Sequence, residues 1–106
     1  MPTPLRLRTD RRSDGTVVVA ATGELDLSNV DAFTDALAAA AGRRDQDGRR
    51  LTVDLTAVEY LDSAAINALF DNAAQVRRIV ANPILMSVLT ISGLASVAEV
   101  QAAESN

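Results

Sequence analysis

The chain has 106 residues, a length typical of one domain, and it contains neither cysteine nor histidine. Disulfides, thiolate nucleophiles, imidazole bases and the common zinc ligand sets are therefore excluded, and we expect no cofactor and no metal site. Ten basic residues, all of them arginine, stand against fourteen acidic residues, and the formal net charge of −4 argues against a nucleic-acid partner.

The N-terminal part of the chain predicts a β-hairpin. Residues 5–9 alternate between apolar and polar side chains, which is typical of an edge strand with one polar face. Residues 11–15 have the composition of a turn, and the β-branched, apolar run at residues 16–22 predicts a strand covered on both faces. No long apolar segment follows Met1, so no secretory signal is expected and the protein should be cytoplasmic.

A helix is predicted next, followed by a polar loop. One helical face is formed by the apolar residues Val30, Phe33, Leu37 and Ala40. Ser28 with Asp31 resembles a capping box, and Gly42 is expected to end the helix. Residues 43–50 contain no apolar residue and predict an exposed loop. The four arginines of this loop could contact RNA, but two aspartates dilute their charge and no aromatic residue is nearby to stack on bases.

The stretch from Leu51 to Phe70 predicts a short strand followed by a helix. Residues 51–56 alternate strictly between apolar and polar side chains, and a turn is expected after them. From Ser63 onward the apolar period becomes that of a helix, through Ile66, Leu69, Phe70 and Ala73. Ser63 therefore lies at or next to the helix N-cap. Its hydroxyl is expected to accept a hydrogen bond from a first-turn N–H, which contributes about 1 kcal/mol.

The C-terminal third predicts a buried strand, a helix and a last strand. The buried strand covers residues 76–81, and an Asn-Pro pair at residues 82–83 starts a helix with proline near its first position. Four apolar residues of this helix are expected to face inward, namely Ile84, Leu85, Val88 and Leu89. A Ser-Gly pair at residues 92–93 ends the helix, and residues 95–100 predict the last strand.

No charged residue occurs between Ile79 and Ala98, a length that could span a bilayer. The Asn-Pro pair and the scattered hydroxyl residues in this stretch fit a buried strand, a helix and a strand better. We therefore expect no membrane span. Residues 1–4 and 101–106 are expected to be flexible ends.

The predicted order of elements is strand, strand, helix, strand, helix, strand, helix, strand. This alternation predicts an α/β domain with a mostly parallel sheet of about five strands and helices packed on it. One domain is expected to span residues 1–106, because no internal repeat or low-complexity tract divides the chain.

Two loops contain most of the chemically distinctive residues. In a parallel sheet the loops that leave strand C-termini meet at one edge, beside the N-termini of helices. The residues placed there are Glu24, Asp26 and Ser28 after the second strand, and Glu59, Tyr60, Asp62 and Ser63 after the third. We expect one small acidic surface at this edge, although each aspartate could instead cap a turn or a helix.

Three segments resemble the STAS domain, the fold of bacterial anti-sigma factor antagonists. GELDLSNVDAF at residues 23–33 resembles the first loop and helix of that family, and LTVDLTAVEYLDSAAI at residues 51–66 its phosphorylation segment. NPILMSVLTISGL at residues 82–94 resembles its third helix and the following turn. The three segments occur in the family's order, and the resemblance extends over nearly the whole chain.

This resemblance implies a phosphorylation switch at Ser63, which follows the Asp-Ser step of the family. In that switch the unphosphorylated protein binds an anti-sigma factor that is also a serine kinase of the ATP-binding type, and thereby releases a sigma factor. The kinase then transfers phosphate to the serine, and a phosphatase reverses the modification. The resemblance places the following residues at the partner-binding surface: Glu24, Asp26, Ser28, Glu59, Tyr60, Asp62, Ser63, Ala64, Ala65 and Asn67.

The chain departs from the family pattern directly after the serine. Ala65 occupies a position that is usually glycine, and Ala64 one that is commonly serine or threonine. The methyl group of Ala65 is expected to narrow the approach of a kinase. The short connection between Ala73 and Val76 is a second departure and is expected to shorten the second helix.

Three other classes of function stay open beside the switch. A STAS-like domain can act as a scaffold without phosphate transfer, as a subunit of a signalling assembly or of a lipid-transport complex. An enzyme with Ser63 as nucleophile is disfavoured, because the chain has no histidine, cysteine or lysine to serve as base and no GxSxG motif. A small-ligand sensor would need a roomy apolar pocket, and no sequence feature indicates one.

Overall fold

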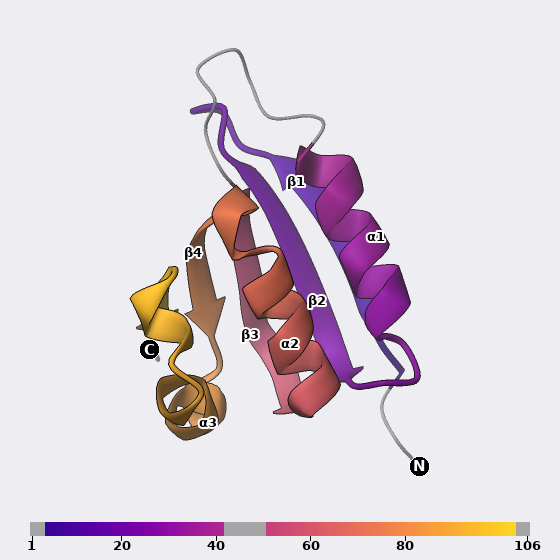
Figure 1. The fold of residues 1–106 in the computed structure, drawn as a ribbon. Helices are drawn as coiled ribbons and strands as arrows, with labels where there is room; N and C mark the ends of the chain where they lie inside the picture. Colours follow the sequence, from indigo (N-terminus) through magenta and orange to yellow (C-terminus); the bar gives the residue numbers. More distant parts are fainter. Residues whose placement is uncertain (1–3, 42–50, 104–106) are drawn as a thin grey trace.

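The computed structural model describes residues 4–41 and 51–103, which form one sheet with helices packed on it (Figure 1). The strands are β1 (Arg6–Arg11), β2 (Val17–Leu25), β3 (Leu51–Leu61), β4 (Val76–Ala81) and β5 (Glu99–Ala102). The α-helices are α1 (Val30–Ala41), α2 (Ser63–Asp71) and α3 (Met86–Ile91). Three single 3₁₀ turns complete the path: η1 (Ala73–Gln75), η2 (Pro83–Leu85) and η3 (Leu94–Ser96).

The five strands lie in the sheet in the order β1-β2-β3-β4-β5. The β1–β2 pair is antiparallel, and every other neighbouring pair is parallel. This confirms the predicted α/β class, the mostly parallel sheet and the alternation of elements. A helix follows each of β2, β3 and β4, so three strand-to-helix loops leave the sheet at the same edge.

Strand β3 is much longer than the sequence period predicted. The expected turn after residue 56 is wrong, because β3 continues to Leu61. Beyond Leu55 the buried residues are three positions apart instead of two, at Val58 and Leu61. Two register shifts between β2 and β3 account for this spacing. At each shift β3 has one extra residue, a β-bulge, so that the next buried side chain of β3 again points into the core. Gly23 lies at one of these shifts with φ of 103°, a backbone conformation that favours glycine.

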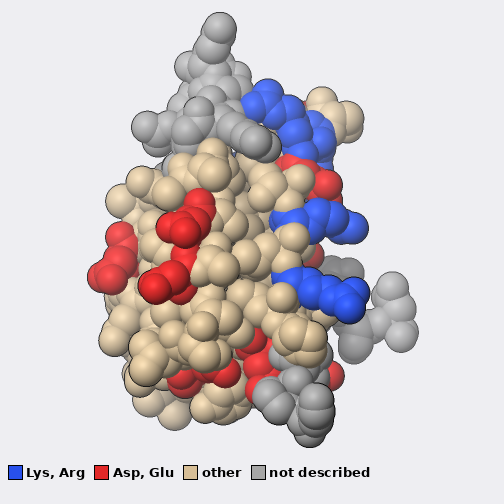
Figure 2. All heavy atoms as spheres, turned by 90° about the vertical axis from the view of Figure 1, so that its right-hand side faces the viewer, with Lys and Arg blue, Asp and Glu red and all other residues tan. Residues whose placement is uncertain are grey.

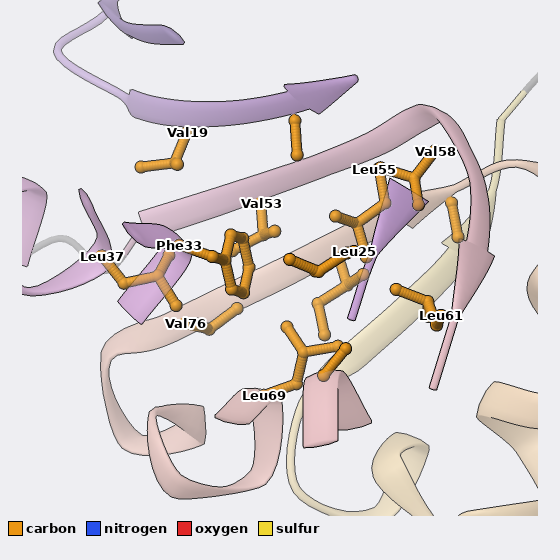
Figure 3. Close-up of a cluster of buried hydrophobic side chains, with 14 of the residues drawn as sticks. Val19, Leu25, Phe33, Leu37, Val53, Leu55, Val58, Leu61, Leu69 and Val76 are labelled. Carbon is orange, nitrogen blue, oxygen red and sulfur yellow. The ribbon is translucent and has the colours of Figure 1, made fainter. Parts of the chain in front are cut away.

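One hydrophobic core lies between the sheet and the helices (Figure 3). Phe33 of α1 is fully buried there, among side chains of β2 and β3. Helices α1 and α2 both lie on one face of the sheet (Figure 1). On the other face Val18 is buried, but Ala20 is only partly buried and Thr22 is exposed. The prediction that the second strand is covered on both faces is therefore confirmed only at the start of β2.

Helix α1 confirms the predicted apolar face, with Phe33, Leu37 and Ala40 all buried. The capping box is wrong: α1 begins at Val30, and the Ser28 hydroxyl donates a hydrogen bond to Asp26 instead of capping the helix. Gly42 and the polar loop at residues 43–50 lie outside the described residues.

The region after β4 follows the predicted order but not the predicted boundaries or faces. Leu85 and Leu89 are buried as expected, whereas Ile84 is 65% exposed and Val88 37% exposed. The helix ends before Gly93, which has φ of 84° and acts as the expected C-terminal stop. Strand β5 begins at Glu99 and includes residues 101–102, which were expected in a flexible tail.

Among the described helices, none has both the length and the apolar character that crossing a membrane requires. The uncharged stretch at residues 79–98 is divided among β4, α3 and two 3₁₀ turns, so its longest helix has six residues.

The two faces of α3 predict different responses to truncation. Leu89→Ala should lower the free energy of unfolding by about 2–5 kcal/mol, because it leaves a cavity in the core. The matched change Ile91→Ala, at a side chain that is 86% exposed, should change it by less than about 0.5 kcal/mol. Urea unfolding of both variants measures this difference, and equal losses would mean that Ile91 faces the core.

Candidate functional site

The site lies where β2 and β3 end side by side. Leu25 pairs with Leu61 as the last residues of the two strands, and both side chains are buried. Their successors, Asp26 and Asp62, therefore begin two neighbouring loops at the same edge of the sheet. The amide of Asp62 also donates a hydrogen bond to the carbonyl of Leu25, at 3.4 Å.

The Asp62 carboxylate joins the two loops. Asp62 is the N-cap of α2, and its Oδ1 accepts a hydrogen bond from the Ala65 amide at 3.0 Å. Its Oδ2 accepts from the Leu27 amide in the other loop, at 2.9 Å. One side chain thus satisfies a free N–H at the start of α2 and fixes the loop before α1 against it.

The loop before α1 is held by its own side chains. Asp26 Oδ1 accepts hydrogen bonds from the amide and the hydroxyl of Ser28. The side chain of Asn29 accepts from the Asp26 amide at 3.0 Å and donates to the Glu24 carbonyl at 2.9 Å. Sequence reasoning missed Asn29, although an asparagine directly before a helix is a recognised capping and turn signal.

Both aspartates therefore have structural roles, the alternative that the sequence left open. Asp26 organises a turn, and Asp62 caps α2 and ties the loops together. The predicted convergence of the two loops is present, but the carboxylates are only partly exposed and are already hydrogen-bonded.

Ser63 is the first residue of α2 and is exposed to solvent. The expectation that its hydroxyl caps the helix is wrong, because the preceding aspartate does so. Within the described part of the chain, no residue forms a hydrogen bond with the Ser63 hydroxyl. The group is therefore open to an incoming reagent or partner.

Most of the other predicted surface residues also lie at this edge. Glu59, Tyr60 and Asn67 are exposed, and Glu24 pairs with Tyr60 across the two strands. Leu27, which sequence reasoning missed, is 75% exposed and lies in the loop that is tied to Asp62. An apolar residue flanked by aspartate and serine in a loop is the sequence signal that could have found it.

Ala65 does not belong to the surface. Its side chain is 0% exposed and is part of the core cluster. The expectations that it contacts a partner and that its methyl group narrows the approach to Ser63 are therefore wrong. Ala64, in contrast, is partly exposed and lines a groove of about 390 Å³ between α1 and α2. The groove is also lined by Asn67 and by residues that sequence reasoning did not place at this surface, Asp31, Thr34 and Asp71 among them.

The charged residues are distributed unevenly over the molecule. On the face drawn in Figure 2 a group of acidic side chains lies on the helix side, and the arginines gather toward the opposite side, where other acidic side chains lie next to them. Among the described residues, Arg8 forms an ion pair with Asp10 and Arg78 with Glu99, and these side chains are exposed or half-exposed. In the part of the chain that the structure describes, no three acidic side chains are placed so that they could hold a metal ion.

A family model described as "Mlab, STAS domain" matches residues 9–102. The chain belongs to the STAS domain family. This confirms the family that the three sequence segments indicated. A search of curated proteins gave no match.

Several solved structures share this STAS fold. An anti-sigma factor antagonist from Mycobacterium paratuberculosis is 23% identical, with a TM-score of 0.81, and the match covers 95% of this chain and 88% of that one. The anti-sigma factor antagonist SpoIIAA in its unphosphorylated form is 17% identical, with a TM-score of 0.68 and coverage of 93% and 89%. Phosphorylated SpoIIAA from Bacillus is 18% identical, with a TM-score of 0.61 and coverage of 93% and 92%.

Two variants of Asp62 should separate its two hydrogen bonds. Asp62→Ala removes both acceptors and should lower the free energy of unfolding by about 1–3 kcal/mol. Asp62→Asn keeps an oxygen for the Ala65 amide but presents an NH₂ group to Leu27, so only the bond between the loops is lost.

Amide hydrogen exchange distinguishes these cases residue by residue. The Leu27 amide should exchange faster in both variants, and the Ala65 amide only in Asp62→Ala. Unchanged exchange at Leu27 in Asp62→Asn would show that the carboxylate does not hold the two loops together.

Proposed function

We propose that this protein is an anti-sigma factor antagonist controlled by phosphorylation of Ser63. In its unphosphorylated form the edge around Ser63 binds an anti-sigma factor that is also a serine kinase of the ATP-binding type, which releases a sigma factor. The kinase phosphorylates Ser63 and ends the interaction, and a phosphatase restores it. The protein acts in the cytoplasm by binding alone and is not itself an enzyme.

The observation that carries this proposal is the exposed hydroxyl of Ser63 at the first position of α2, which has no hydrogen-bond partner among residues 4–41 and 51–103. Because Asp62 is the N-cap of α2, the Ser63 hydroxyl is not needed to cap this helix. The hydroxyls of Ser28, Ser92 and Ser96, in contrast, donate hydrogen bonds within the protein. The similarity in fold to two anti-sigma factor antagonists, one of them solved with and without phosphate, supports the same assignment.

The physical effect of a phosphate at Ser63 would fall on the interface and not on the fold. A phosphate adds roughly −1.5 to −2 charges at neutral pH. The N-terminus of α2 favours negative charge by about 0.3–1 kcal/mol, which offsets part of the repulsion from Asp62. A partner docked on this edge would have to desolvate the new charge or face it with like charge. A cost of about 3 kcal/mol there is enough to weaken binding about 100-fold.

A second candidate function is that of a STAS scaffold that binds partner subunits without phosphate transfer, in a signalling assembly or a lipid-transport complex. The matching family model favours it, because its description names a STAS domain and no anti-sigma factor antagonist. The exposed residues Leu27 and Tyr60 beside Ser63 would serve a permanent partner equally well.

Phosphorylation can be mapped directly. Incubation with an anti-sigma factor kinase and Mg-ATP should add one phosphate, at Ser63, because this hydroxyl is exposed and has no partner among the described residues. Mass mapping of proteolytic fragments measures the position. Phosphate found only on Ser28, Ser92 or Ser96 would overturn the assignment, and a kinase that binds without transferring phosphate would favour the scaffold.

A pair of variants separates charge from shape at Ser63. Ser63→Asp and Ser63→Ala should both keep the free energy of unfolding within about 1 kcal/mol of the parent, since neither touches the cap of α2. Ser63→Asp should weaken binding of the anti-sigma factor kinase, and Ser63→Ala should bind it about as tightly as the parent does.

The titration should be carried out at about 0.15 M salt, where charges more than roughly 8 Å apart are largely screened. A charge effect that persists there acts at the interface itself. Equal affinity of the two variants would contradict a charge switch at Ser63.

A further inference from the structure

A polar hollow of about 320 Å³ lies on the open face of the sheet, the face opposite α1 and α2. Thr52 and Asp54 of β3 form part of its lining, and they alternate along the strand with the core residues Val53 and Leu55. The other lining residues come from the hairpin turn that precedes β2 and from β4, the two neighbours of β3. The hollow therefore lies beside the first residues of β3, whereas Ser63 follows the end of that strand.

An irregularity in β4 brings two successive arginines to this hollow. Two successive residues of β3 pair with Val76 and Arg78, so Arg77 is an extra residue in β4, a β-bulge. Val76 and Ile79 are both buried in the core, while Arg77 and Arg78 both line the hollow. In a regular strand successive side chains alternate between the two faces, and one of these arginines would point into the core. The bulge thus places two guanidinium groups on the open face.

The arginines around the hollow have unused hydrogen-bond donors. Within the described part of the chain, the side chains of Arg12 and Arg77 form neither an ion pair nor a hydrogen bond. Arg78 donates from Nε to Glu99 at 2.7 Å, which orients its side chain and leaves its two terminal nitrogens without a partner among the same residues. Strands β2 and β4 are two strand spacings apart, about 10 Å, a distance that arginine side chains from both sides can bridge over one small ligand. Guanidinium groups in such a position favour a phosphate, whose oxygens they bind in pairs.

Two aspartates line the same hollow and restrict what can bind there. Asp54 Oδ1 accepts a hydrogen bond from the Thr56 amide, and Asp14 Oδ1 accepts one from the Thr16 amide, each at 2.9 Å. A bare anion would meet the negative charge of these carboxylates, whereas a hydroxyl group would find in them a hydrogen-bond acceptor. A ligand that carries both a phosphate and hydroxyl groups therefore matches both kinds of lining residue.

We propose that this hollow binds a small phosphorylated sugar or a similar polyol phosphate. Arg12, Arg77 and Arg78 hold the phosphate, and Asp54 accepts hydrogen bonds from the hydroxyl groups. The volume lies at the lower end of the range of ligand pockets, about 300–1,000 Å³, and fits a molecule with one phosphate and not a polymer. The site does not rest on the proposed function, because the length of β3, roughly 30 Å, separates it from Ser63.

Titration of the isotope-labelled protein with glucose-6-phosphate, followed by NMR chemical shifts, tests the site. The amide signals of Thr16, Thr52 and Arg77 should shift and reach saturation, and the signal of Ser63 should stay in place. Glucose without its phosphate should cause no saturable shift, because the arginines then have no anion to bind.

A pair of arginine variants separates the hollow from general surface charge. Arg77→Gln should weaken binding of glucose-6-phosphate about tenfold, because it removes charge-assisted hydrogen bonds to the phosphate. The side chain is exposed, so the fold should be kept. Arg8→Gln, the matched change at an exposed arginine of β1 that does not line this hollow, should leave the affinity unchanged.

Asp54→Asn tests the contact with the hydroxyl groups. Asparagine keeps an oxygen for the Thr56 amide but loses the negative charge and the second acceptor. The parent should bind glucose-6-phosphate about tenfold more tightly than inorganic phosphate, since hydrogen bonds to a charged acceptor are lost with the sugar. The variant should bind inorganic phosphate more tightly than the parent does, and the two ligands about equally.

Several outcomes would overturn the site. The first is the absence of saturable shifts up to about 10 mM glucose-6-phosphate, which excludes even weak binding. Equal losses of affinity in Arg77→Gln and Arg8→Gln would mean that surface charge and not the hollow attracts the ligand. If Asp54→Asn kept the preference for glucose-6-phosphate over inorganic phosphate, this carboxylate would not bind the hydroxyl groups and the proposed class of ligand would be wrong.

Discussion

The geometry of the β2–β3 edge depends on the two hydrogen bonds that the Asp62 carboxylate accepts. One comes from the start of α2 and the other from the loop that leads into α1. Two helices that are far apart in the sequence therefore begin from one fixed point at the end of the sheet. Without this carboxylate, a free N–H at each loop would depend on solvent, and the two loops would lose the side chain that joins them.

This arrangement changes what a serine at the next position can do. If Ser63 were the cap, as its position in the sequence suggested, a modification would act directly on the group that holds the helix start. Because the carboxylate of Asp62 performs that task, a change at Ser63 would alter the charge of the surface and leave the helix start in place. Different residues thus hold the helix and present the hydroxyl.

The sequence predicted most of the fold because apolar periodicity is a direct consequence of facing one core. The prediction failed where the spacing of the buried residues changes within one element. In β3 the buried positions move from a spacing of two to a spacing of three, and only pairing with β2 reveals the bulges that make this a strand. In α3 apolar residues occupy both faces, so periodicity could not tell Leu89 from Val88. Family resemblance and loop position predicted the candidate site residues, but not which of them caps α2. Which of two adjacent residues caps a helix depends on backbone angles that the sequence does not display, and here Asp62 and Ser63 were equally good candidates.

Two surfaces of different physical character thus follow strands of the same sheet. The edge beyond β2 and β3 holds aspartates in fixed positions and presents a hydroxyl, so binding of a partner there would respond to added charge. The α3 region, beyond β4, contains no charged residue from Ile79 to Ala98, so a phosphate on Ser63 would change its apolar character little.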